Sequence, residues 1–196
     1  MSVQFEEEVP ISIGSEAENT VCLTGHDWRH LNNPWGADNP ENADISHLVY
    51  TQGQIRQGAG GLGYHEIHVE ESGMYQFELR RWPLEDGRPI QEGISAAEQD
   101  FYTEGVQEKN HDLYVGGKPL PFTQANIRID AVTGACGSND SAEGDTVFTS
   151  TTPISPSDHH ATFTAKLSKG PHNLTCWFEG DNDLLRSAYY VYVRKA

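Results

Sequence analysis

The adjacent pair His26-Asp27 has residue types that could do acid–base chemistry, because an aspartate can orient a histidine toward a nucleophile. No Gly-x-Ser-x-Gly elbow or similar nucleophile motif accompanies the pair. A histidine and an aspartate at the end of a strand, bonded to nearby backbone, is therefore the favoured interpretation. We assign no catalytic residue and expect that the chain is not an enzyme. An independent hydrolase built on His26 and Asp27 is the least favoured hypothesis.

Metal binding is a second chemistry that the residue types suggest. His65 and His68 fall in a strand-like segment, so their side chains point to opposite faces and do not share one metal. The pair at 159–160 has no second ligand pair at zinc-like spacing. Acidic segments at 139–145 and 179–183 carry the oxygen ligands that calcium prefers, but the second is better explained as a hairpin turn. We predict no metal ligand and no cofactor, with calcium as the weaker alternative.

Aromatic side chains offer a third chemistry, because exposed rings stack on sugar faces while nearby polar groups bind the hydroxyls. Trp28 and Trp35 flank a polar loop and have the best claim to a surface site. The ligand-binding residues that we predict are Trp28, Trp35, Arg81, His26 and Asp27.

The aromatic residues of the strand-like segments are expected in the core instead. They are Trp82, Trp177, Tyr190 and Tyr192. Arg80 and Arg81 alternate across a strand, so one guanidinium is expected to face inward and to need a carboxylate partner.

The charge balance excludes two classes of partner. The chain has 13 basic and 29 acidic residues, a net charge of −16. Nucleic acids and anionic membrane surfaces both require a basic surface, so neither is expected as a partner. No apolar run approaches the length of about 18 residues that a transmembrane helix needs. Residues 1–8 lack the basic and apolar regions of a signal peptide, and we expect them to be disordered or added to the natural sequence.

Short alternating segments separated by Gly, Pro, Asn and Asp predict many strands and few helices. The predicted strands are 9–13, 20–24, 64–69, 74–82, 112–115, 126–131, 160–167, 173–179 and 187–194. Residues 95–101 predict one short helix with a capping box, residues 69–74 predict a hairpin turn, and residues 167–172 predict a second tight turn. The pattern predicts an all-β fold, an antiparallel β-sandwich or jelly roll with long loops and at most one or two short helices.

The segments between the strands include three long loops, at 29–48, 83–111 and 133–158, of a length that is usually functional or mobile. No linker divides the chain, so we predict a single domain over residues 1–196. Of the three cysteines, Cys22 and Cys176 lie in strand-like segments near opposite ends. A disulfide between them requires that the first and last strands are neighbours, which the sequence leaves open.

An ordered set of motifs spans nearly the whole chain. The most specific contains Leu79-Arg80-Arg81-Trp82-Pro83. The others include Leu23-Thr24-Gly25-His26-Asp27-Trp28, Pro34-Trp35, Ala125-Asn126-Ile127-Arg128-Ile129 and Ala188-Tyr189-Tyr190-Val191-Tyr192-Val193. The set resembles the C-terminal domain of bacterial arylsulfatase-type sulfatases. The family usually continues Pro-Trp with Asn-Gln, whereas this chain has Gly36-Ala37. The sulfatase motif Cys/Ser-x-Pro/Ala-x-Arg is absent from the sequence, so no catalytic residue of the family is carried over.

The resemblance implies a non-catalytic accessory domain that packs on a sulfatase-type catalytic domain, contacts its glycan substrate, or does both. It also implies a secreted or periplasmic parent protein. The alternative hypothesis is a free-standing carbohydrate-binding module that recognises a plain or sulfated polysaccharide.

Overall fold

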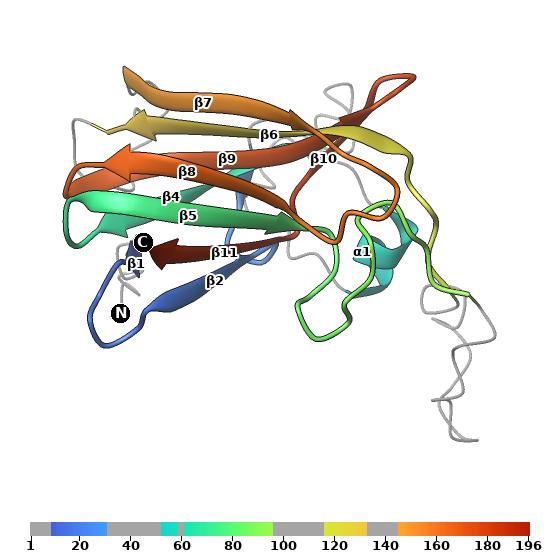
Figure 1. Cartoon of the computed structure of the whole chain (residues 1–196), viewed down its shortest axis with the longest axis horizontal. Coiled ribbons are helices and arrows are strands. Elements are labelled where there is room, and N and C mark those ends of the chain that lie inside the picture. Colours follow the sequence, from blue (N-terminus) through green and yellow to red (C-terminus); the bar gives the residue numbers. More distant parts are fainter. Residues whose placement is uncertain (1–8, 31–51, 59–60, 96–115, 133–144) are drawn as a thin grey trace, which may run out of the picture.

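A computed structural model describes residues 9–30, 52–58, 61–95, 116–132 and 145–196. The described strands form two β-sheets that face each other, which confirms the predicted β-sandwich (Figure 1). One short helix, α1 (Gln52–Gln57), lies at one end of the sandwich. No helix among the described residues is long and apolar enough to span a membrane.

The larger sheet has the strand order β1-β4-β9-β6-β7, with β3 paired to β4 and β10 paired to β9. Its pairs are antiparallel except for β1 with β4. The bounds are β1 (Ile11–Ile13), β3 (Arg29–His30), β4 (Gly63–Val69), β6 (Phe122–Ala131), β7 (Asp145–Pro153), β9 (Gly170–Gly180) and β10 (Leu184–Ser187).

The smaller sheet has the order β2-β11-β5-β8, all antiparallel. Its strands are β2 (Thr20–Thr24), β5 (Gly73–Arg80), β8 (Ala161–Leu167) and β11 (Tyr190–Lys195). The last strand in the chain, β11, therefore lies in the interior of the sheet, between β2 and β5.

The core lies between the sheets because successive side chains of a strand point to opposite faces, so one face of each sheet can be apolar. Strand β8 shows this most simply: Ala161, Phe163, Ala165 and Leu167 are buried, while the residues between them are exposed. Buried residues of β6 and β9 supply the opposite wall, namely Ala125, Ile127, Ile129, Leu174, Cys176 and Phe178. Residues on the other side of β4, β6 and β9 therefore belong to the outer face of the larger sheet.

Two predicted turns connect different sheets. The turn at 69–74 joins β4 of the larger sheet to β5 of the smaller one, and the turn at 167–172 joins β8 back to β9. The tight turn at 167–172 is confirmed. The hairpin prediction for 69–74 was wrong because a tight turn can reverse the chain within a sheet or carry it across the core, and the local sequence does not distinguish the two. The turn at 180–183 is confirmed as the β9–β10 hairpin, with Asn182 and Asp183 at φ of 57° and 59°.

Some elements were missed or fall elsewhere. Strand β7 lies in the stretch that we predicted as the loop 133–158, where Thr and Ser made it resemble a polar loop although threonine is β-branched and suits a strand. Strand β3 and helix α1 were also missed. The predicted strand at 112–115 and nearly all of the helix at 95–101 lie outside the described residues. Cys22 and Cys176 are free thiols, because β2 pairs with β11 and not with β9.

Candidate functional site

Trp28 is buried rather than presented to solvent. Only 3% of its surface is exposed, and its ring packs at 5.6 Å from the ring of Tyr189 and edge-on to His65 at 6.4 Å. It belongs to a second apolar cluster with Ile55 and Trp82 at one end of the sandwich. The structure thus corrects the prediction that Trp28 is an exposed sugar-stacking ring.

His26 and Asp27 lie on the exposed turn after β2. Asp27 Oδ2 accepts hydrogen bonds from the Thr24 N–H and the Thr24 hydroxyl, both at 2.9 Å, and the His26 N–H donates to the Thr24 hydroxyl at 3.3 Å. The aspartate therefore closes its own turn, as the favoured interpretation of the sequence required. Within the described residues, no group of three or more His, Cys, Asp or Glu side chains could hold a metal ion.

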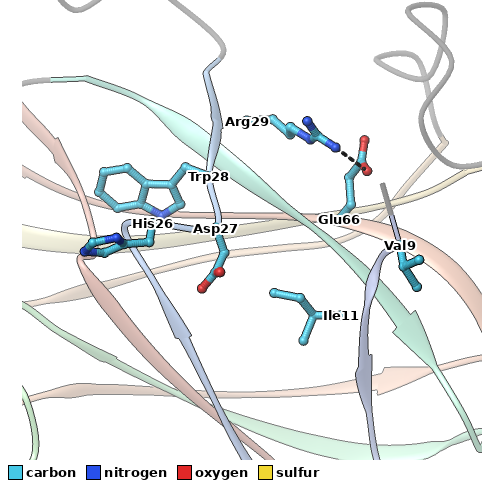
Figure 2. Close-up of a pocket in the computed structure, with 7 residues that line it drawn as sticks. All are labelled: Val9, Ile11, His26, Asp27, Trp28, Arg29 and Glu66. Carbon is cyan, nitrogen blue, oxygen red and sulfur yellow. Dashed lines mark hydrogen bonds and ion pairs between the residues drawn. The ribbon is translucent and has the colours of Figure 1, made fainter. Parts of the chain in front are cut away.

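These residues border a small hollow of about 180 Å³ at the edge of the larger sheet. Figure 2 shows the Arg29–Glu66 ion pair, at 3.4 Å, across the hollow from the His26 imidazole. The lining residues are Val9, Ile11, His26, Asp27, Trp28, Arg29 and Glu66. Among the described residues that line the hollow, the indole of Trp28 is packed into the core and offers no face on which a sugar could stack.

Arg81 is completely buried. Its guanidinium donates hydrogen bonds to the carbonyl oxygens of Lys118 at 2.6 Å and Glu92 at 3.2 Å, and a longer one to that of Arg56 at 3.5 Å. It also lies 4.4 Å from the ring centroid of Trp82. Burial lowers the pKa of Arg81 to about 10. Arg81 is thus a structural link between three segments, which corrects its prediction as a ligand-binding residue.

The expected inward-facing arginine is found, but its partners are carbonyl oxygens rather than a carboxylate. The preceding residue, Arg80, does contact a carboxylate, Glu78 Oε1 at 2.5 Å, and it donates to His160 Nδ1 at 3.2 Å. Trp82 is buried as predicted, and its indole N–H donates to the Glu92 carbonyl at 3.0 Å. Trp35 lies outside the described residues, so its role stays a prediction.

Sequence reasoning missed a larger cleft on the outer face of the larger sheet, which we call the outer cleft. Its volume is about 310 Å³, and it crosses strands β4, β9 and β6. The lining residues are Leu62, Tyr64, Arg128, Asp130, Asn173, Thr175 and Trp177. Two aromatic rings and several hydrogen-bonding side chains therefore line one cavity on a rigid surface.

The sheet register explains why distant residues meet in this cleft. Tyr64, Thr175 and Arg128 are paired in one row across β4, β9 and β6, and Asn173 is paired with Asp130 in the next row. Neighbouring strands lie about 4.8 Å apart and residues two apart share a face, so the rows form one platform. Each side chain is held by a strand whose other face is locked into the core.

Trp177 was predicted in the core, but it lies on the outer face and is partly exposed. Its indole N–H donates to Glu179 Oε1 at 2.5 Å, which fixes the orientation of the ring. Tyr64 lies on the neighbouring strand, displaced from Trp177 by two residues, a diagonal relation in which Cα atoms are about 7–8 Å apart. The two rings are thus close enough to contact one ligand.

Arg128 and Asp130 form the charged part of the cleft. Arg128 Nε donates to Asp130 Oδ1 at 2.9 Å, and the Thr146 hydroxyl donates to the same oxygen at 2.6 Å. The Arg128 side chain is 51% exposed, whereas that of Asp130 is 10% exposed. The aspartate is therefore fixed by two bonds, and the arginine extends over it toward solvent.

Comparison with known proteins does not assign the chain to a family. No family model matches the chain, and no curated protein matches it significantly in sequence. The resemblance to sulfatase C-terminal domains therefore stays a prediction. Among solved structures, the chain is similar to a ruminal GH26 endo-beta-1,4-mannanase, with 11% identity and a TM-score of 0.39 over 93% of this chain. It spans 27% of that enzyme's length.

A second similar structure is a CBM35 from Cellvibrio japonicus Abf62, with 12% identity and a TM-score of 0.34. The match covers 89% of this chain and 91% of the CBM35. TM-scores this low do not support an inference about function from either structure. The function is therefore argued from the outer cleft itself.

Proposed function

We propose that this chain is a non-catalytic carbohydrate-binding module that binds a polysaccharide in the outer cleft. The observation that carries the proposal is the cleft of about 310 Å³, in which Tyr64 and Trp177 accompany Arg128, Asp130, Asn173 and Thr175. Aromatic faces provide apolar contact with the C–H face of a sugar, and charged and amide groups bind its hydroxyls. This was the alternative hypothesis from the sequence, with different residues.

The fold supports binding because it holds these groups in place before a ligand arrives. Residues on paired strands lose little conformational freedom on binding, and Trp177 is already oriented by Glu179. Less of the contact energy is therefore lost to ordering the site. A cleft across several strands also suits an extended ligand, which can cross the sheet from one strand to the next.

The cleft does not suit glycoside hydrolysis. That reaction generally uses two carboxyl groups on either side of the scissile bond. Asp130 is the one carboxylate among the described residues that line the outer cleft, and it is bonded to Arg128 and Thr146. The geometry therefore favours a binding module over an enzyme.

The accessory-domain hypothesis receives no specific support. A lost partner surface should leave a contiguous exposed apolar patch. The large exposed apolar side chains of the described residues lie on four separate segments: Val9, Met74, Leu84 and Val147. Packing on a sulfatase-type catalytic domain remains a prediction from the sequence.

Replacing Trp177 with alanine is expected to weaken polysaccharide binding roughly ten- to a hundredfold, because it removes an aromatic contact of about 1.5–3 kcal/mol. The matched control is Tyr192→Ala, which removes a partly exposed aromatic side chain from the smaller sheet. Affinity electrophoresis through gels that contain a panel of polysaccharides identifies the ligand, and calorimetry with the retained polysaccharide measures the affinity.

The melting temperature of each variant, measured in parallel, separates loss of the site from loss of the fold. We expect Trp177→Ala to bind weakly while it melts cooperatively, and Tyr192→Ala to bind as the unmodified chain does. Failure of every polysaccharide to retard the unmodified chain would overturn the proposal. So would equal affinities for Trp177→Ala and the unmodified chain.

A further inference from the structure

The charges in and beside the outer cleft are already matched. Arg128 is bonded to Asp130 in the cleft, and Arg29 is bonded to Glu66 on the adjoining part of the same sheet. Glu66 is the register partner of Asn173, which lines the cleft. A third carboxylate, Glu179, holds the Trp177 ring. In and beside the cleft, these residues contribute two positive guanidinium groups and three negative carboxylates. They therefore provide no surplus positive charge for an anionic ligand.

The Arg128–Asp130 pair retains hydrogen-bonding capacity for a neutral ligand. Arg128 uses only Nε among the described residues, so its terminal nitrogens can donate. Within the described part of the chain, the hydrogen bonds that Asp130 accepts from Arg128 and Thr146 both fall on Oδ1, so Oδ2 can accept. A donor and an acceptor side by side match two adjacent sugar hydroxyls, because each hydroxyl is both a donor and an acceptor.

Resting on the proposed function, we propose that the outer cleft selects a neutral polysaccharide, with Arg128 and Asp130 binding two adjacent hydroxyls of one sugar. A sulfated or uronic chain that accepted from the terminal nitrogens of Arg128 would place its anionic group beside the Asp130 carboxylate. Like charges in contact oppose binding, and the chain's net charge of −16 repels anions at long range. The Arg128–Asp130 pair therefore binds neutral glycans, and its carboxylate repels acidic ones.

The substitution Asp130→Asn tests this selectivity by the sign of its effect. For a neutral ligand, it removes a charged acceptor, and affinity is expected to fall roughly tenfold or more. For an anionic ligand, it removes a repelling charge, and affinity should rise. The matched control is Glu18→Gln, which makes the same change in net charge on the exposed turn between β1 and β2.

Both variants and the unmodified chain would be titrated with neutral mannan, xylan and β-glucan, and with polygalacturonate and carrageenan, in 50 and 500 mM NaCl. We expect binding to a neutral polysaccharide that changes less than about twofold with salt, falls in Asp130→Asn and is unchanged in Glu18→Gln. Tighter binding of an acidic polysaccharide than of any neutral one by the unmodified chain would overturn the selectivity but leave the module proposal standing. Binding of a neutral polysaccharide that is unaffected by Asp130→Asn would also overturn it. No binding to any of the five would overturn both proposals.

Discussion

Replacing Arg81 with alanine should lower the free energy of unfolding by about 3–5 kcal/mol, the range seen when one partner of a buried charged network is removed. The guanidinium is fully buried and its strongest bonds go to the carbonyl oxygens of Glu92 and Lys118. Its removal leaves the Lys118 carbonyl without this donor, leaves the Glu92 carbonyl with the Trp82 indole N–H, and leaves a void against the Trp82 ring. Thermal or urea unfolding followed by circular dichroism measures the effect.

Two further variants sharpen the Arg81 experiment. Arg81→Lys keeps the charge but lacks the planar fork that reaches several carbonyls, so it should recover only part of the loss. Arg194→Ala removes an arginine from the surface of the smaller sheet and should cost under about 0.5 kcal/mol. Polysaccharide binding by folded Arg81 variants should be unchanged. If Arg81→Ala unfolded with nearly the same free energy as the unmodified chain, the guanidinium would not be the link that joins these three segments.

The stability of the fold should decrease between pH 6.5 and pH 4 because of His65. Burial lowers the pKa of His65 to about 4, from an ordinary value of 6.5, although a hydrogen bond with the Thr24 carbonyl opposes the shift. In this window the unfolded chain binds a proton that the folded chain does not, so acid favours unfolding. The loss amounts to about 2–3 kcal/mol at pH 4.5.

Urea unfolding of the unmodified chain and of His65→Gln, measured at half-unit intervals from pH 4.5 to pH 8.5, tests this pH dependence. The difference in unfolding free energy between the two should be constant above pH 7.5 and should change by about 2–3 kcal/mol toward pH 4.5. His172, whose pKa burial also lowers, contributes to both proteins and cancels in the difference. If the unfolding free energies of the two proteins differed by the same amount at every pH, His65 would be protonated as readily in the folded chain as in the unfolded chain.

The strands were predictable where alternation was regular. Residues 20–24 were predicted with the bounds of β2, and 160–167 differ from β8 by one residue, because their buried and exposed positions alternate strictly. Alternation also predicted that His65 and His68 point to opposite faces of their strand. His65 is buried and His68 is partly exposed. Alternation does not say which strands pair, so the turn at 69–74, which crosses between the sheets, was mistaken for a hairpin.

The site was harder to predict because it depends on register. Trp177, Arg128 and Tyr64 come from three strands far apart in the sequence, and only their pairing places them in one cleft. Whether a tryptophan is buried or exposed was also predicted wrongly in two opposite cases. Trp28 adjoins a polar loop but turns into the core, and Trp177 lies in an apolar strand but on its solvent side.

The position of β11 has a consequence for the order in which the smaller sheet can form. Residues 190–195 are far in the sequence from β2 and β5, yet they join β2 to the β5–β8 pair. Without β11, β2 has no described partner in its sheet. The smaller sheet therefore closes only through contacts between residues far apart in the sequence, a topology that slows folding.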